Sequence, residues 1–278
     1  MRVISVPFGA GGRGPGPAAA PARIIADLRA HGARLDVTEA FPPIGTAPRV
    51  LSHAEIADYM QRALAAVAAH RDEQPLLILG GDHTISVGTF AGFAAEPPLG
   101  CIWLDAHPDM NTNGTTPSGN VHGMSLAIEL GHGDAVFTAI GGHSPKLLPQ
   151  HTAVVGIRAV DPGEQLLREK MPSLGWILAS ELKAIGPLAV AERVAKQMAG
   201  TQVVISLDVD IIDPTEMQAV VAPVWGGPST QAVVELLGVL AQKVQLAALE
   251  VVELDWDHPQ AEAMLPVVRQ LIKAAVDI

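Results

Sequence analysis

Short apolar runs alternate with helix-like segments along the whole chain, and this limits the folds open to it. Residues 76–79 and 102–104 are wholly apolar and residues 203–207 nearly so, whereas residues 51–71 repeat apolar side chains at helical spacing. Strands separated by helices pair in parallel through crossover connections. The sequence therefore predicts an α/β protein with a mainly parallel sheet. It shows no internal repeat and no convincing linker, so we expect one domain over residues 1–278.

Ionisable residues follow the predicted strands. Asp105, Asp208 and Glu253 come directly after three of them, and His83 and Asp161 lie a few residues beyond two others. In open parallel sheets, ligands bind at the edge formed by the carboxyl ends of the strands. We therefore expect the functional site at that edge.

Six of the residues near these strand ends are of types that bind metals. They are His83, Asp105, His107, Asp109, Asp208 and Asp210. Alternate side chains of an extended segment point the same way, so the two Asp-rich clusters should each converge. Crowded carboxylates would otherwise repel one another and hold their protons. The pattern thus predicts bound cations.

The ligand types indicate which cation. Structural zinc sites are usually rich in Cys, and this chain has one cysteine, Cys101. Oxygen ligands with some imidazole favour a harder ion such as Mn²⁺. Six ligands are many for one ion, and four carboxylates balance the charge of two. Two Mn²⁺ ions per subunit are therefore predicted, and such a pair lowers the pKa of water that lies between its members.

Three other segments leave alternatives open. The polar residues 111–120 include Ser118 and Asn120, which would either cap the next helix or hold a polar ligand. His122 would be a surface residue or, beside a metal site, a proton shuttle. The glycine-rich residues 9–17 would form a linker or a loop over one sheet edge, and no Lys-Ser/Thr follows to support a phosphate loop. Asp82 and Asp213 flank the ligand-type residues and would either support them or form turns, with the turn role favoured.

The composition limits the kinds of molecule that the protein is expected to bind. The formal charge is −11 and the chain has no basic run, which argues against nucleic acid and anionic membranes. A lone cysteine allows no intramolecular disulfide, and the N-terminus reaches glycine and proline too soon for a signal peptide. No apolar stretch approaches the ~20 residues that span a bilayer. We expect a soluble cytoplasmic protein that binds a small polar molecule.

Six segments together resemble the ureohydrolases, the family that includes arginases and agmatinases. They are Gly80–Ser86, Trp103–Thr112, Ser118–Met124, Val155–Glu164, Ser206–Pro214 and Glu250–Asp255. The first, second and fifth resemble the whole family, and the third and fourth resemble arginases in particular.

The resemblance implies a three-layer α/β/α sandwich with a dimanganese centre on the six residues named above. It implies hydrolysis of a guanidino compound to urea and an amine, most simply L-arginine to L-ornithine. It also implies a homo-oligomer, because trimers and hexamers are common in the family.

The same resemblance assigns roles to the residues around the metals. Asn111, Thr116 and Ser118 would contact the substrate carboxylate, and Asp161 and Glu164 its α-amino group. His122 matches the proton-shuttling histidine, and Glu253 matches the acid that binds the guanidinium group.

The chain departs from the family pattern around the substrate. Val220-Val221-Ala222-Pro223 replaces a Thr-Gly-Thr-Pro segment, Leu254-Asp255-Trp256 replaces a Val-Asn-Pro turn, and Ala159 stands where many arginases have an acid. These changes spare the metal ligands. They keep open a different guanidino or formimino acid as substrate, and a non-catalytic relative that only binds metal.

Overall fold

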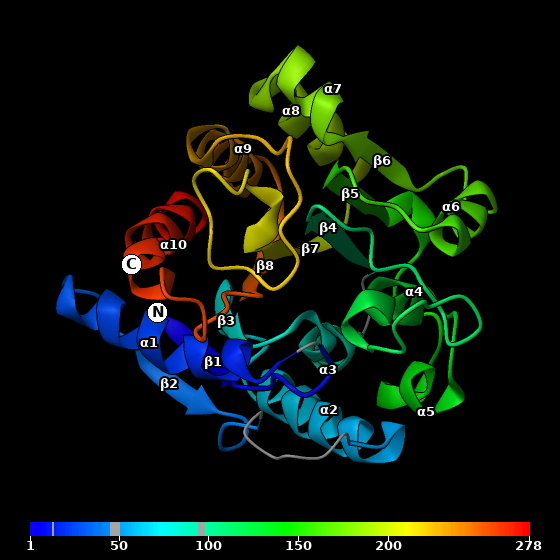
Figure 1. Ribbon diagram of the computed structural model, residues 1–278, viewed down its shortest axis with the longest axis horizontal. Helices are drawn as coiled ribbons and strands as arrows, with labels where there is room; N and C mark the ends of the chain where they lie inside the picture. The colour runs from blue at the N-terminus through cyan, green and yellow to red at the C-terminus, as the bar shows by residue number, and fades with distance from the viewer. Residues whose placement is uncertain (13, 45–50, 94–97) are drawn as a thin grey trace.

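The computed structural model describes residues 1–12, 14–44, 51–93 and 98–278, and its centre is one sheet of eight strands (Figure 1). The strand order is β2-β1-β3-β8-β7-β4-β5-β6, and every neighbouring pair is parallel. The strands are β1 Arg2–Val6, β2 Asp36–Glu39, β3 Leu76–Gly80, β4 Leu99–Leu104, β5 Thr152–Ile157, β6 Gly175–Leu178, β7 Gln202–Asp208 and β8 Gln245–Val252. The predicted parallel α/β architecture is confirmed.

Helices cover both faces of the sheet. The α-helices are α1 Gly16–Ala30, α2 His53–Ala68, α3 Ser86–Phe93, α4 Ser125–Glu129, α5 Ala135–Thr138, α6 Pro162–Glu169, α7 Ala179–Ile185, α8 Pro187–Gln197, α9 Thr230–Lys243 and α10 Ala261–Ala275. The 3-10 turns are η1 His83–Ile85, η2 His122–Met124, η3 Ile140–Gly142, η4 Pro149–His151 and η5 Val209–Ile211. None of the helices in the described ranges is long and apolar enough to cross a membrane.

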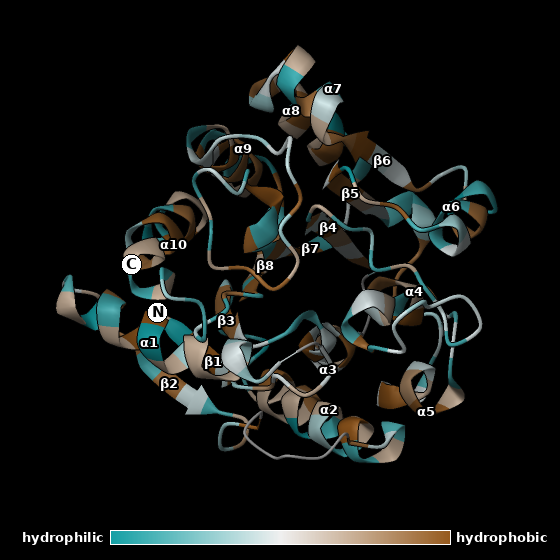
Figure 2. Cartoon of the chain, viewed as in Figure 1, coloured by the Kyte–Doolittle hydropathy of each residue, from teal (hydrophilic) through white to brown (hydrophobic). Residues whose placement is uncertain are grey.

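Two hydrophobic cores lie between the sheet and its helices. Along β3, Leu77 and Leu79 enter the core with α1 and α8–α10, while Leu76 and Ile78 enter the core with α2–α5. Successive side chains of a strand point to opposite faces, so a central strand must be apolar at every position. Figure 2 shows that the covering helices carry both hydrophobic residues (brown) and hydrophilic residues (teal). The two cores hold the strand ends rigidly in register.

Five elements were not predicted from the sequence: β2, β6, α3, α5 and α7. β2 and β6 are short edge strands with half-exposed residues, and each pairs with only one neighbouring strand. α3 is buried all round, so it has no polar face to reveal a helical period. Residues 121–130 are divided between η2 and α4, because the amides of Leu126 and Ala127 donate to the Asp109 carbonyl.

Candidate active site

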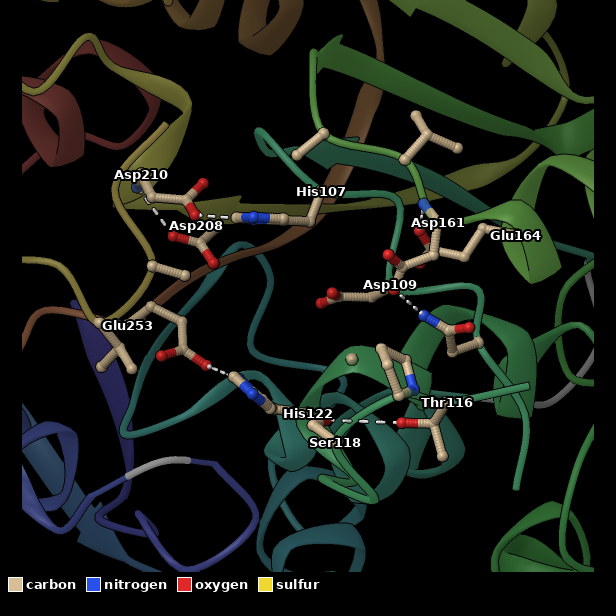
Figure 3. Close-up of a pocket in the computed structure, with 17 residues that line it drawn as sticks. His107, Asp109, Thr116, Ser118, His122, Asp161, Glu164, Asp208, Asp210 and Glu253 are labelled. Carbon is tan, nitrogen blue, oxygen red and sulfur yellow. Dashed lines mark hydrogen bonds and ion pairs between the residues drawn. The ribbon is translucent and has the colours of Figure 1, made fainter. Parts of the chain in front are cut away.

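Five neighbouring strands end at one pocket (Figure 3). β3, β8, β7, β4 and β5 lie side by side in the sheet, and the residues that follow them line the hollow or lie directly behind it. The lining residues are His107, Asp109, Asn111, Thr116, Pro117, Ser118, His122, Gly123, Ala159, Val160, Asp161, Glu164, Asp208, Asp210, Val221, Ala222 and Glu253. The sheet therefore gathers the site residues that were predicted at its carboxyl edge.

The first candidate metal group surrounds His83, which is fully buried. Its Nδ1 lies 3.2 Å from Asp105 Oδ2, 3.1 Å from Asp109 Oδ2 and 3.6 Å from Asp208 Oδ2. The same nitrogen has no hydrogen-bond partner among the described residues despite these close oxygens. A buried nitrogen without a hydrogen-bond partner and three carboxylate oxygens that converge on it fit a shared cation.

The second candidate metal group surrounds His107. Its Nδ1 lies 2.9 Å from Asp210 Oδ2 and 3.5 Å from Asp105 Oδ1. Asp105 thus turns one oxygen to each imidazole, and it belongs to both groups of possible ligands. A carboxylate shared in this way is what a two-metal site requires.

The electrostatics agree with bound cations. Burial, Asp210 and Asp105 together raise the pKa of Asp208 well above its usual range. Burial and Asp105 raise the pKa of Asp210 to about 6, although His107 opposes the shift. These carboxylates resist ionisation beside one another, and divalent cations would relieve that repulsion.

Turns, rather than the extended segments that we expected, bring the ligand-type groups together. Asp208 ends β7, and its Oδ1 accepts a 2.7 Å bond from the amide of Asp210, which lies in η5. Residues 105–109 bend after β4, and Asp109 has a φ of +49°. The alternation argument was therefore wrong about local conformation, because the chain must turn where the sheet ends.

The side chains of His122 and Glu253 point toward each other, and Asp109 lies on the other side of the pocket (Figure 3). Nδ1 of His122 lies 3.0 Å from Glu253 Oε1, which also accepts a 2.7 Å bond from the amide of His83. Burial opposes a charge on His122, but Glu253, Asp109 and Asp82 raise its pKa to about 9. The neighbouring carboxylates thus favour the protonated form of the imidazole. Glu253 has a φ of +67°.

Five polar residues form what we call the polar rim of the pocket, and hydrogen bonds among them hold it in place: Asn111, Thr116, Ser118, Asp161 and Glu164. Asn111 Nδ2 donates to Asp161 Oδ2 at 2.8 Å, and Thr116 Oγ1 lies 3.5 Å from Ser118 Oγ. Glu164 accepts from the amides of Asp161 and Met110, and burial raises its pKa to about 7. The structure brings all five predicted substrate-binding residues to the pocket, where Glu164 also fixes the backbone.

Part of the pocket wall is apolar. Ala159, Val160, Val221 and Ala222 line it, and Val220 forms a β-bridge with Leu254 just after Glu253. Two of the segments that depart from the family pattern, residues 220–223 and 254–256, are thus adjacent in space.

A polar network behind His83 was not predicted. Nε2 of His83 lies 2.9 Å from Ser206 Oγ, which donates to the buried Glu250 at 2.8 Å. Ser206 therefore accepts from Nε2–H, which leaves Nδ1 free to act as a ligand. Trp103 stacks on His83 at 3.9 Å and donates to Asp105 at 3.0 Å. A serine and a glutamate inside apolar strands were the signal available in the sequence.

Comparisons with known proteins agree with this geometry. The profile of the arginase family matches residues 1–272. The chain belongs to the arginase family. Arginase from Bacillus caldovelox is 37% identical over 227 residues, which cover 77% of this chain and 75% of that protein.

Solved arginases share the fold over nearly their whole length. The crystal structure of Bacillus cereus arginase has a TM-score of 0.89 at 30% identity and covers 99% of this chain and 96% of that one. Entamoeba histolytica arginase in complex with L-ornithine has a TM-score of 0.91 at 27% identity, with 100% and 98% covered. Members of the family are metal-dependent ureohydrolases, and this arginase-family chain is a hydrolase of that kind.

Proposed function

We propose that this chain is a dimanganese hydrolase that cleaves a guanidino compound to urea and an amine, with L-arginine to L-ornithine as the leading reaction. The observation that carries the proposal is the pair of ligand groups that share Asp105 and lie beside His122 and Glu253. His83, Asp105, His107, Asp109, Asp208 and Asp210 would hold the two ions. Bound there, the ions would supply hydroxide at neutral pH.

Other residues of the chain would bind the substrate and transfer the proton. Oε1 of Glu253 is held by two donors, and its Oε2 would receive the guanidinium group. Glu253 lies 3.0 Å from Nδ1 of His122 and favours its protonated form, which would donate a proton to the departing amine. Asn111, Thr116 and Ser118 would bind the substrate carboxylate, and Asp161 and Glu164 its amino group. The single-domain organisation, the cytoplasmic location and a trimeric or hexameric assembly also stay predictions.

The apolar wall supports a second candidate. Val221 and Ala222 offer no side-chain hydroxyl to the pocket, so a different guanidino acid or a formimino acid is the nearest rival to L-arginine. Agmatine is less favoured, because it has no carboxylate for the rim to hold. A non-catalytic metal-binding relative is the remaining alternative, and a proton-donating His122 argues against it.

The test is urea release by manganese-loaded protein from a panel of guanidino acids that includes L-arginine, with formamide release measured from a formimino acid. His122→Asn is the control and should lower kcat by about 10²–10⁴-fold while manganese content stays the same. Full manganese occupancy without turnover of any compound would support the non-catalytic relative instead.

A further inference from the structure

The glycine-rich segment between β1 and α1 lies against the candidate proton donor. Gly11 and Gly12 belong to this segment, which runs below Glu253 as a blue ribbon in Figure 3. The sequence left open whether these glycines form a linker or a loop over the sheet edge. In the structure, the described residues 9–12 and 14–15 form a loop rather than a linker, residues 16 and 17 begin α1, and residue 13 lies outside the described ranges.

Asp82 fixes Gly11 in place. The Gly11 amide donates to Asp82 Oδ2 at 2.7 Å, and Oδ1 of the same carboxylate accepts from the Thr84 amide at 3.0 Å. Asp82 is 1% exposed, so both bonds are shielded from water. A Cβ on Gly11 would lie 1.9 Å from Thr84 Oγ1, so only glycine fits there. The loop is therefore anchored beside η1.

The anchored loop contacts His122 twice. The His122 amide donates to the Gly11 carbonyl at 3.2 Å. A Cβ on Gly12 would lie 3.4 Å from Nδ1 and 3.5 Å from both Cε1 and Cγ of the imidazole. Near-equal distances to three ring atoms place Gly12 over the face of the ring. Glu253 holds the edge of the same ring through Nδ1 at 3.0 Å.

We propose that Gly11 and Gly12, held by Asp82, position His122 for proton transfer. Gly11 fixes the backbone, and the bare Gly12 leaves room beside one face of the ring, so Nδ1 stays on Glu253 and Nε2 stays available to the pocket. A branched side chain at position 12 would push the imidazole away from Glu253. The inference rests on the proposed function, because it assumes that His122 donates a proton.

The decisive variant is Gly12→Val, matched with Gly14→Val in the same loop. A Cβ on Gly14 would meet nothing within 4 Å, and neither glycine has a positive φ that a side chain would strain. Gly12→Val should lower kcat by about 10–100-fold, less than the roughly 10²–10⁴-fold that a general acid contributes, with KM within about two-fold. Gly14→Val should match the wild type.

Two further readouts separate positioning from misfolding. The Cε1–H resonance of His122, followed by NMR in the full-length protein without manganese, should shift in Gly12→Val and stay unchanged in Gly14→Val. Gly12→Ala keeps an ordinary contact distance, so it should fold normally and lose only a few-fold in kcat. Manganese content should be the same in all variants.

The outcomes are distinct. An unchanged His122 resonance in both Gly12 variants would overturn the positioning role, as would a loss of kcat that only parallels a loss of manganese. If the wild type released no urea, the proposed function would fail, yet the resonance would still report whether Gly12 sets the position of the ring.

Discussion

At the scale of single residues, Asp105 joins the two candidate metal groups. It is fully buried, and burial alone would raise its pKa, but His107 and His83 lower the pKa below its usual range. Its oxygens also accept from the His107 amide and the Trp103 indole. The carboxylate is therefore ionised and fixed in orientation before any metal binds.

Asp105→Asn should remove manganese and activity together. An amide has no charge and only one ligand oxygen, so it cannot serve both groups. We expect manganese per subunit to fall from two to one or fewer, measured by elemental analysis, and urea release to fall at least 10²-fold. Asp213→Asn is the control, because Asp213 binds the amides of Gly226 and Gly227 in a turn. Full metal content in Asp105→Asn would refute the shared role.

The site residues visible in the sequence were those with distinctive chemistry. His83, Asp105 and Asp208 stand out because charged groups directly follow apolar strands. The role of Gly12 could not be predicted, because the ring beside it belongs to a residue more than a hundred positions away and glycine has no side chain that would indicate a function. Residues with ligand-type side chains could thus be recognised from the local sequence, whereas residues that position them are recognised only from tertiary contacts.

At the scale of elements, the half-buried Arg158 connects the end of β7 with the apolar wall. Its guanidinium donates to the carbonyls of Asp210 at 2.7 Å, Ile211 at 3.0 Å and Val224 at 2.8 Å. The planar guanidinium has five donors in a fixed fork, which a lysine cannot reproduce. Arg158 therefore fixes the distance between a metal-ligand turn and the pocket wall.

Arg158→Lys should loosen that wall. Each carbonyl that loses its donor costs about 1–3 kcal/mol when buried, so the thermal unfolding midpoint should fall. KM should rise more than kcat falls, since we expect the wall to contact the substrate rather than the reacting atoms. The matched control is Lys183→Met, because Lys183 reaches Gly226 of the same loop from the exposed side. Equal effects in the two variants would contradict the proposed connection.

Among the elements, central strands were predictable and edges were not. β3 and β7 are apolar on both faces because two helical layers cover them. β2 and β6 lack that constraint, so their composition resembles that of loops. The four-residue β2 also carries acidic residues at both ends, which conceals its pairing with β1.

At the scale of the whole molecule, a buried carboxyl and a buried amine lie close together away from the pocket. Glu129 is fully buried, its Oε1 lies 3.8 Å from Lys146 Nζ, and Lys146 donates to the Thr138 carbonyl at 3.1 Å. Burial raises the pKa of Glu129 to about 8, helped by Glu250 and opposed by Lys146. The folded protein therefore binds a proton here that the unfolded chain has released.

This difference predicts how stability depends on pH. Below pH 4.5, the ordinary pKa of the group, Glu129 is protonated in both states. As pH rises from there to about 8, the folded state alone keeps the proton, so stability falls. At about 1.4 kcal/mol per pKa unit, the loss is of the order of a few kcal/mol.

Glu129→Gln should remove this part of the pH dependence. Its thermal unfolding midpoint should fall less than that of the wild type between pH 5 and pH 8, because the amide does not titrate. Glu129→Gln with Lys146→Met controls for the lost ion pair. Parallel curves for the wild type and both variants would show that Glu129 keeps no extra proton in the folded state.

Asp109 and Glu253 are the two residues other than glycine with positive φ in the described ranges, and both lie at the pocket. Left-handed backbone costs most residues about 1 kcal/mol or more, and glycine or asparagine avoids much of that cost. Stability alone would therefore favour glycine or asparagine at both positions. The fold instead accepts backbone strain at two positions where a carboxylate faces the pocket.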